Sequence, residues 1–354
     1  MAAYVSALLA EADETARALQ NARFTTVFLG GGTPSLLPAP LLTTLLIGLR
    51  SRFDIAADAE FTTEANPGTL TADWLYAAVQ GGVNRLSLGM QARQPELLAL
   101  LGRIHRFEQV AESVHLAREA GLENISLDLM FGLPGQTLPQ WLDTLSAALS
   151  LHPAHLSCYG LIPEDGTPLK ADLDAGRLSL PKEETERAMY DAALDRLAAA
   201  GFQQYEISNF ALPGRECRHN LGYWRQTPYL GLGASAASML PGRPGCAYLR
   251  TANPASLDGY LDMVQNRRWT DREETPVSPR EAQFETMMLG LRTTRGVSEQ
   301  DFLAMHAVSL DSRYGATLRR LEREGLLAHC DGRWFLTRRG MDVQNAVLVE
   351  LMDD

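Results

Sequence analysis

The sequence has few cysteines, and they lie far apart. The four thiols, Cys158, Cys217, Cys246 and Cys330, include no pair at CxxC spacing. Neither a disulfide framework nor a self-contained zinc site is therefore indicated. We expect most of these cysteines to be inert buried thiols.

Long apolar runs and an N-terminal signal peptide are also missing. No stretch approaches the roughly 18 apolar residues of a membrane span, and no charged-then-apolar segment opens the chain. We therefore expect a soluble, cytoplasmic protein.

Positive charge is scarce as well, because 32 Lys and Arg face 43 Asp and Glu, a formal net charge of −11. This balance argues against a general nucleic-acid binder, since phosphate needs a cationic surface.

The sequence does contain a regular alternation of strand and helix patterns. The 354 residues are 45% hydrophobic, enough for a large core. A helix is expected over 4–20, followed by strands at 25–30, 59–65, 85–90, 125–131, 155–161 and 203–210. Helices are expected between them at about 39–52, 71–80, 94–102, 107–120, 138–151 and 183–200. Such units predict an α/β fold with a parallel sheet, either a barrel or a doubly wound sheet.

The chain is organised around residues 25–37, TTVFLGGGTPSLL. An apolar, β-branched run stops at Gly30-Gly31-Gly32, where no side chain holds a ligand away from the backbone. Pro34 fixes the exit from the loop, and Ser35 could cap the next helical segment. Tight strand-to-helix turns also use glycines, so the triplet alone is a weak signal.

Polar residues end one predicted strand after another. Glu64 and Asn66 lie at the end of the second predicted strand, and Gln91 lies at the end of the third. Asp128 and residues 132–134 (GLP) lie at the end of the fourth. In a barrel, groups at the carboxyl ends of the strands share one face. The pattern therefore predicts an assembled binding site.

The character of the chain changes after about residue 240. Residues 1–240 form the predicted barrel domain, 241–281 a proline- and charge-rich surface connection, and 282–354 a C-terminal domain. The order of helix, helix, helix and hairpin in this last part is typical of a winged helix, with Asp331-Gly332 as the tight turn. The basic residues of this domain could bind DNA, but a packing module with a solvated basic face suits the acidic chain better. They are Arg319, Arg320, Arg323, Arg338 and Arg339.

The segment CRHNLGYW at 217–224 places a Cys, a His and two aromatic residues close together. A neutral His219 imidazole can ligate heme iron, and Tyr223 and Trp224 could cover a porphyrin face. Cys217 is either a second ligand or a small buried thiol. The alternative for His219 is a loop histidine hydrogen-bonded to the backbone.

Six motifs in a fixed order carry a family resemblance. They are GGGTPSLL at 30–37, TTEANPGTL at 62–70, GVNRLSLGMQ at 82–91, LGRIH at 101–105, SLDLMFGLPGQT at 126–137 and HNLGYW at 219–224. Together they resemble the coproporphyrinogen III oxidase-like branch of the radical S-adenosylmethionine (SAM) proteins. The resemblance is dense from residue 4 to about 240 and loose beyond. It implies a partial (β/α)6 barrel that lacks its first strand, with a winged-helix-like α+β domain after it.

The resemblance also implies SAM contacts. Gly31, Gly32 and Thr33 match the motif that binds the SAM amino group through backbone carbonyls, and Glu64 matches a carboxylate that can pair with an ammonium. A second set of side chains binds the rest of the ligand: Gln91 and Asp128 match the ribose contacts, and Arg103 matches a basic contact to the SAM carboxylate.

One defining motif of the family is missing from the sequence. CxxxCxxC supplies three thiolates to a [4Fe-4S] cluster, and it occurs nowhere in this chain. We expect a truncated chain or a misplaced start codon, with 25–30 as an exposed edge strand. The alternative is a cluster-free paralogue that keeps heme binding. As written, the chain is predicted to bind no iron–sulfur cluster, whereas full-length relatives are expected to hold one.

The leading functional hypothesis is a heme chaperone that passes heme to acceptor proteins, because HNxxYW resembles the heme-binding signature of chaperones in this branch. The respiratory chain or the membrane is where such acceptors would be expected. The runner-up is an oxygen-independent coproporphyrinogen III oxidase. A third hypothesis is a transcriptional regulator with the barrel as ligand sensor. The sequence leaves open whether the chain forms a homodimer.

Overall fold

The computed structural model describes residues 1–19 and 22–352. These residues form two compact units, each described by itself. The barrel unit comprises residues 22–204 and 208–217. The terminal unit comprises residues 1–19, 205–207 and 218–352.

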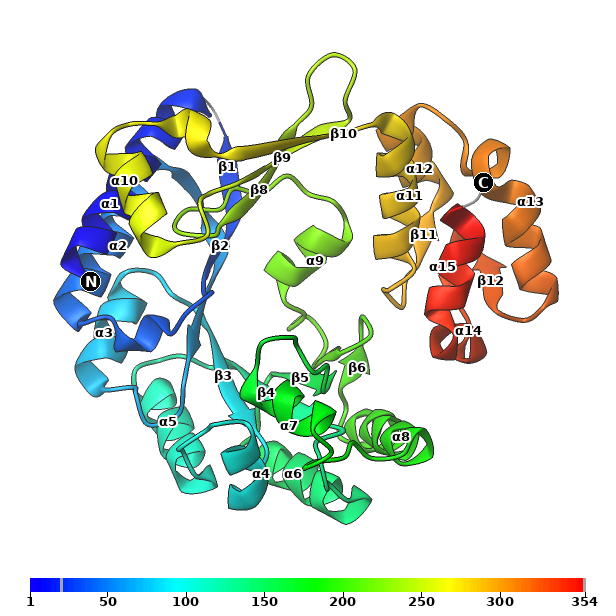
Figure 1. The fold of residues 1–354 in the computed structure, drawn as a ribbon, viewed down its shortest axis with the longest axis horizontal. Helices are drawn as coiled ribbons and strands as arrows, with labels where there is room; N and C mark the ends of the chain where they lie inside the picture. Colours follow the sequence, from blue (N-terminus) through cyan, green and yellow to red (C-terminus); the bar gives the residue numbers. More distant parts are fainter. Residues whose placement is uncertain (20–21, 353–354) are drawn as a thin grey trace. The chain divides into compact units, whose positions relative to one another are not determined.

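The barrel unit is built on a curled seven-stranded sheet, a half-barrel (Figure 1). Its strands, in the order β1-β2-β3-β4-β5-β7-β6, are β1 (Arg23–Leu29), β2 (Asp54–Ala65), β3 (Arg85–Gln91), β4 (Asn124–Phe131), β5 (His155–Gly160), β7 (Asn209–Ala211) and β6 (Gln203–Gln204). Strands β1 to β5 are parallel. The predicted partial barrel is therefore confirmed, and β1 lies at one edge of the sheet.

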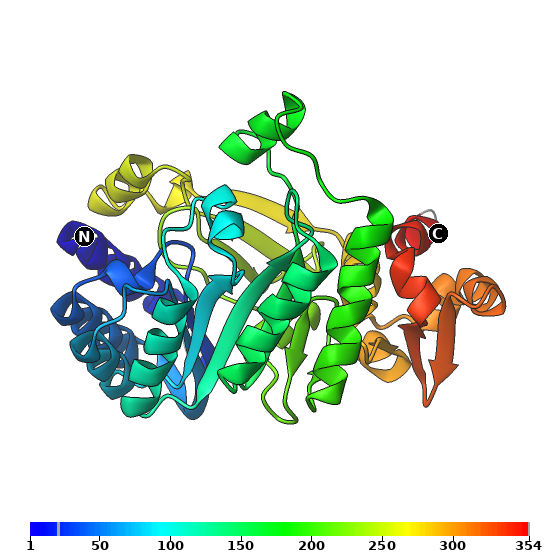
Figure 2. The same cartoon turned by 90° about the horizontal axis from the view of Figure 1, so that it is seen from below.

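Helices cover the outer face of this sheet (Figure 1). The helical segments are η1 (Pro34–Leu36), α2 (Ala39–Arg52), α3 (Ala72–Gln80), α4 (Pro95–Leu100), α5 (Phe107–Glu119), α6 (Leu138–Ser150), α7 (Pro168–Asp174) and α8 (Glu183–Ala199). Figure 2 shows the segment with α7 projecting beyond the ends of the strands. The predicted helices of this region agree with these bounds to within about two residues.

Strand β3 shows why the interior face can hold a site. Its sequence alternates, and Leu86, Leu88 and Met90 are fully buried in the apolar core that includes the helices. Because side chains alternate across a strand, the residues between them face the opposite, interior side of the sheet. These interior residues include Arg85 and Ser87.

The sixth sheet element differs from its prediction. A single strand was expected over 203–210, but the structure has the two short strands β6 and β7, with β7 antiparallel to β5. The interruption falls at residues 205–207, which belong to the terminal unit, where Glu206 pairs with Thr293.

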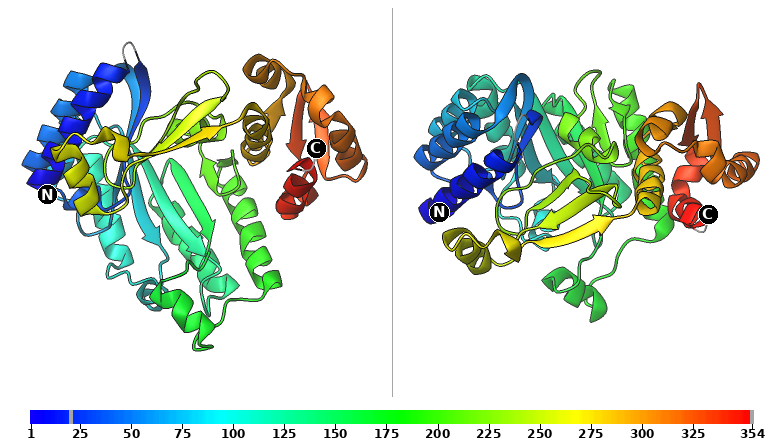
Figure 3. Two further views of the ribbon diagram at one scale, coloured as in Figure 1. Left: turned by 45° about the horizontal axis from the view of Figure 1, so that its top comes forward. Right: turned by 90° about the horizontal axis from the view of Figure 1, so that it is seen from above.

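The terminal unit begins with α1 (Ala2–Ala18) and includes α9 (Arg218–Trp224) and the sheet β10-β9-β8. The elements around this sheet are β8 (Ala237–Pro241), β9 (Tyr248–Ala252), α10 (Leu257–Gln265), η2 (Trp269–Asp271) and β10 (Glu273–Val277). The segment expected as a connection thus contains regular structure. Helix α10 packs beside α1 (Figure 3) because Tyr260, Met263 and Val264 form a buried apolar face.

The last part of the terminal unit has winged-helix order. It contains α11 (Pro279–Gly290), β11 (Val297–Ser298), α12 (Glu299–His306), α13 (Leu310–Arg323), β12 (Leu327–Cys330), β13 (Arg333–Leu336), α14 (Arg338–Asp342) and α15 (Gln344–Met352). Asp331 and Gly332, with φ of 51° and 68°, turn β12 into the antiparallel β13 as predicted.

The basic residues of this domain are partly paired: Arg319 pairs with Asp311, and Arg320 with Glu324 and Glu350. These pairs favour the interpretation of this face as a solvated, internally paired surface.

A buried carboxylate connects several elements of the terminal unit. Glu11 of α1 is 0% exposed. It accepts hydrogen bonds from Gly233 N at 2.8 Å, Asn253 Nδ2 at 2.7 Å, Tyr260 OH at 2.7 Å and Arg272 Nη2 at 2.8 Å. Four donors thus stabilise one buried charge.

Across residues 1–19 and 22–352, no helix has the length and apolar composition that a membrane crossing requires.

Candidate functional site

The loop after β1 needs glycine because it lies against a carboxylate. A Cβ on Gly30 would lie 2.6 Å from Phe28 Cε1 and 2.8 Å from Glu64 Oε2. Gly31 has φ of +85°, a left-handed conformation that glycine adopts freely, and its N–H donates to the Glu64 carboxylate. The glycine loop and the end of β2 therefore meet directly.

Asn66, just after β2, joins this loop to a basic side chain. Its Nδ2 donates to Thr33 Oγ1 at 3.3 Å, and its Oδ1 accepts from Arg103 Nη1 at 3.2 Å. The segment that carries Arg103 is anchored by His105, whose Nε2 lies 3.1 Å from the Met90 carbonyl oxygen. Arg103 uses one of its five donors here, which leaves a planar cation able to bind an acidic group.

Gln91 ends β3 in an unusual backbone conformation. It has φ of +61°, and the register of β3 against β4 shifts between Gly89 and Gln91. A Cβ on Gly89 would lie 3.0 Å from Gln91 Nε2 and 3.7 Å from Asn66 Oδ1. The bulge therefore turns the Gln91 amide back over Gly89, toward Asn66.

Asp128 of β4 is held by hydroxyl groups from three neighbouring strands. Ser87 Oγ lies 3.2 Å and 3.1 Å from the two carboxylate oxygens, and Ser126 and Ser157 also donate to Asp128. Strand register explains this arrangement, because Ser87 pairs with Ser126, and Asp128 with Ser157. The hydroxyls fix the orientation of the carboxylate.

Both carboxyl groups of this site have a raised pKa. Loss of solvation, followed by the negative charge of Asp128, raises the pKa of Glu64, although the Gly31 N–H opposes this. Loss of solvation also raises the pKa of Asp128, while the serine hydroxyls and Arg85 oppose the shift. Both side chains are half-buried. Neighbouring carboxylates with raised pKa favour a cationic ligand, which would restore both charged forms.

The structure thus brings together the glycine loop, Glu64, Gln91, Arg103 and Asp128 at the carboxyl ends of β1 to β4. Sequence reasoning placed Asn66 at a strand end but assigned it no contact, and it missed the serines altogether. Ser87, Ser126 and Ser157 occupy interior-facing positions of adjacent strands. That alternation was the signal that could have found them.

The residues predicted to contact heme lie on two units. His219, Tyr223 and Trp224 belong to α9 in the terminal unit, and Cys217 belongs to the barrel unit. His219 Nε2 lies 3.0 Å from Tyr223 OH, and the Tyr223 ring packs edge-on against Tyr229 with centroids 4.8 Å apart. Cys217 is buried, and its Sγ lies 3.4 Å from Glu60 Oε1.

The cysteines do not fit an iron–sulfur cluster. Cys158 lies in β5, Cys217 precedes α9, Cys246 lies between β8 and β9, and Cys330 ends β12. Burial and the nearby Asp128 raise the pKa of the Cys158 thiol above the usual range, which opposes thiolate formation. In the part of the chain that the structure describes, no three His, Cys, Asp or Glu residues are placed to hold a metal ion.

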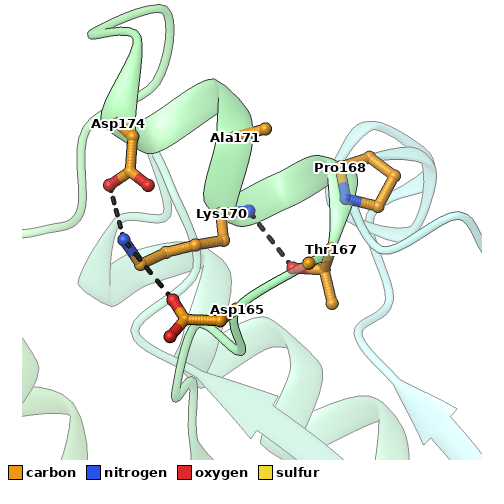
Figure 4. Close-up of a pocket in the computed structure, with 7 residues that line it drawn as sticks. Asp165, Thr167, Pro168, Lys170, Ala171 and Asp174 are labelled. Atoms are coloured by element: carbon orange, nitrogen blue, oxygen red, sulfur yellow. Dashed lines mark hydrogen bonds and ion pairs between the residues drawn. The ribbon is translucent and has the colours of Figure 1, made fainter.

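A pocket of about 350 Å³ lies on the projecting segment with α7, and none of the predicted site residues lines it (Figure 4). Lys170 lies between Asp165, at 4.0 Å, and Asp174, at 2.5 Å. Thr167 Oγ1 accepts from Lys170 N at 3.3 Å and caps the helix. The lining is therefore paired within the segment itself.

Comparisons with known proteins agree with this fold. The family described as "Radical SAM superfamily" matches residues 3–148, and "HemN C-terminal domain" matches residues 277–343. The structure of Escherichia coli coproporphyrinogen III oxidase (HemN) superposes with a TM-score of 0.81 and 22% identity, over 98% of this chain and 82% of that chain. This last likeness shows a shared fold.

Sequence relatives are closer. The heme chaperone HemW of Bacillus subtilis is 39% identical over 345 residues, which cover 97% of this chain and 89% of the relative. The heme chaperone HemW of Escherichia coli is 36% identical over 347 residues, 98% of this chain and 88% of the relative.

The half-barrel and the family match over residues 3–148 define the class as radical SAM. Within that class, the chain belongs to the HemW family. Membership implies SAM and a [4Fe-4S] cluster as cofactors of the superfamily. The residues present fit SAM, since paired carboxylates, an amide and an arginine match its cationic, hydroxyl and carboxylate groups, whereas the cysteines do not fit the cluster.

Proposed function

We propose that this protein is a cytoplasmic heme chaperone, which binds heme at α9 through His219 and passes it to heme-accepting proteins. The observation that carries the proposal is the identity of 33–41% to proteins named heme chaperone HemW, which for the Bacillus subtilis protein extends over 97% of this chain. Helix α9 supports it, because it presents an imidazole and an exposed tyrosine on one face.

Residues His219 and Tyr223 are one helical turn apart, and their rings pack edge-on with centroids 4.9 Å apart. Iron at Nε2 of His219 would displace the Tyr223 hydroxyl from that nitrogen. Cys217 is the candidate second ligand, and its thiol would first have to leave Glu60.

Titration of the full chain with hemin tests heme binding. We expect a saturable Soret band that is lost in His219→Ala and retained in the matched control His115→Ala, whose side chain is 71% exposed in the barrel unit. Loss of the band in Cys217→Ala as well would identify the second ligand. Equal Soret bands for His219→Ala and the unaltered chain would refute the assignment of His219.

Transfer of heme tests the chaperone activity itself. The heme-loaded protein is mixed with an apo heme protein, and the absorption of the acceptor is followed. A chaperone should load the acceptor faster than it releases heme to an inert scavenger such as serum albumin. Equal rates for both recipients would indicate passive dissociation.

We further propose that SAM occupies the site at the strand ends. Gly31, Gly32 and Thr33 would bind its amino group together with Glu64. The remaining contacts would be Gln91 and Asp128 to the ribose and Arg103 to the carboxylate. Equilibrium binding of SAM to the full chain tests this proposal.

The alternative activity is oxidative decarboxylation of coproporphyrinogen III, which the superposition on HemN favours at the level of the fold. Anaerobic incubation with coproporphyrinogen III, SAM and a reductant, followed by product analysis, separates the two. The chaperone proposal predicts no product from this chain.

A further inference from the structure

Two unpartnered hydrogen-bond donors border helix α9. The indole Nε1 of Trp224, the last residue of α9, is buried without a hydrogen-bond partner among the described residues, and so is Nε of Arg292. Buried polar groups in folded proteins are nearly always hydrogen-bonded, so two such donors in one place require an explanation.

The two side chains that carry these donors are in contact. The guanidinium carbon of Arg292 lies 5.9 Å from the centroid of the Trp224 ring, a cation–π contact. Both residues belong to the terminal unit, where α9 packs against α11 and Arg292 follows α11. The cation–π contact holds the guanidinium over the indole ring, and Trp224 Nε1 and Arg292 Nε remain available for a third group.

Within residues 1–19 and 22–352, neither Arg292 Nε nor Trp224 Nε1 has a hydrogen-bond partner. An arginine next to an indole offers a positive charge together with N–H donors from both groups, and a carboxylate binds well to such charged donors.

We propose that Trp224 and Arg292 form a carboxylate subsite that binds a propionate group of heme. The inference rests on the proposed function, because His219 of the same helix is the expected iron ligand. Trp224 lies five positions after His219, a rise of about 7.5 Å along the helix axis, which is on the scale of the half-width of a porphyrin. Trp224 therefore contributes its N–H edge to the carboxylate, in addition to any contact with the porphyrin face.

Hemin and hemin dimethyl ester, whose propionates are blocked, test the subsite in the full chain. Arg292→Gln should weaken hemin binding about tenfold, the loss typical of one charged hydrogen bond, and leave the affinity for the diester unchanged. Trp224→Phe keeps the aromatic ring but removes the N–H, and it should weaken hemin alone by several-fold. Arg292→Lys should be intermediate, because it keeps the charge without the planar fork.

The matched control is Arg295→Gln, an exposed arginine three residues away, which should change neither affinity. The Soret maximum should stay the same in every Arg292 variant, because the iron ligand is intact. Equal losses for hemin and its diester in Arg292→Gln, or no loss for either, would overturn the subsite. Failure of the unaltered chain to bind hemin would instead refute the proposed function.

Discussion

Carboxylates with opposite surroundings distinguish the two units of this protein. In the terminal unit, Glu11 is fully buried and accepts hydrogen bonds from four donors, one of them an arginine. In the barrel unit, Glu64 and Asp128 are half-buried, and the charge of Asp128 is among the causes that raise the pKa of Glu64.

The difference distinguishes a carboxylate that stabilises the fold from carboxylates that are expected to bind a ligand. A carboxylate saturated by donors of its own chain stabilises the fold and has no need of a ligand. The negative charge of Asp128 raises the pKa of Glu64, an unfavourable interaction that a cationic ligand relieves. We therefore expect Glu11 substitutions to affect stability, and Glu64 and Asp128 substitutions to affect binding.

Glu11→Ala should produce the largest effect. It leaves Arg272, Asn253 and Tyr260 without their acceptor, and removal of one partner of a buried ion pair typically costs about 3–5 kcal/mol of unfolding free energy. Urea denaturation measures this loss. The control Glu14→Ala, on the same helix in a surface pair with Arg17, should lose less than about 1 kcal/mol. Similar losses for the two variants would contradict the structural role of Glu11.

Asp128→Asn should lower SAM affinity about tenfold or more, because a charged acceptor is replaced by a neutral one while the shape is kept. Isothermal titration calorimetry measures the change. Asp143→Asn removes a carboxylate that pairs with Arg93 on the surface of the barrel unit, and its SAM affinity should match the unaltered chain. A tenfold loss in Asp143→Asn would point to a general effect of charge instead.

Gly30→Ala should destabilise the barrel unit by about 1–3 kcal/mol, the usual cost of overpacking. The added Cβ would meet Phe28 and Glu64 at less than 3.0 Å. For stability, Gly32→Ala is the matched comparison, because no atom lies within 4 Å of its added Cβ. The midpoint of thermal unfolding should be lower for Gly30→Ala than for Gly32→Ala. Equal midpoints would show that the loop accommodates the added methyl group without loss of stability.

Ser87→Ala should have the smallest effect, a loss of several-fold in SAM affinity that grows as the pH falls. The missing hydroxyl raises the pKa of Asp128 further, so the carboxylate is protonated earlier on acidification. Affinities measured at two pH values check the trend. A loss that is equal at both would show that Ser87 acts on shape and not on charge.

Much of the barrel was predictable, because β-branched strands, amphipathic helices and polar strand ends are local patterns. Strand β3, for example, is indicated by the alternation of Leu86, Leu88 and Met90. By contrast, the split of the sixth strand depends on the pairing of Glu206 with Thr293, a contact between segments far apart in the chain. Helix α10 was missed because its apolar face is short and a charge-rich stretch follows it directly.

The site shows the same limit. Family motifs indicated Glu64, Gln91, Arg103 and Asp128, yet no motif indicated the three serines, whose role depends on strand register. The contact between Arg292 and Trp224 could not be predicted from local sequence patterns, because the two residues are 68 positions apart.

Proton release on SAM binding tests the central claim most directly. Because the pKa values of Glu64 and Asp128 are raised, these groups hold more protons in the ligand-free protein than ordinary carboxyl groups would, and a cation should expel them. Calorimetry in two buffers of different ionisation enthalpy should show net proton release, with affinity rising with pH, and Glu64→Gln should reduce the release. Binding without proton exchange and independent of pH would contradict the account.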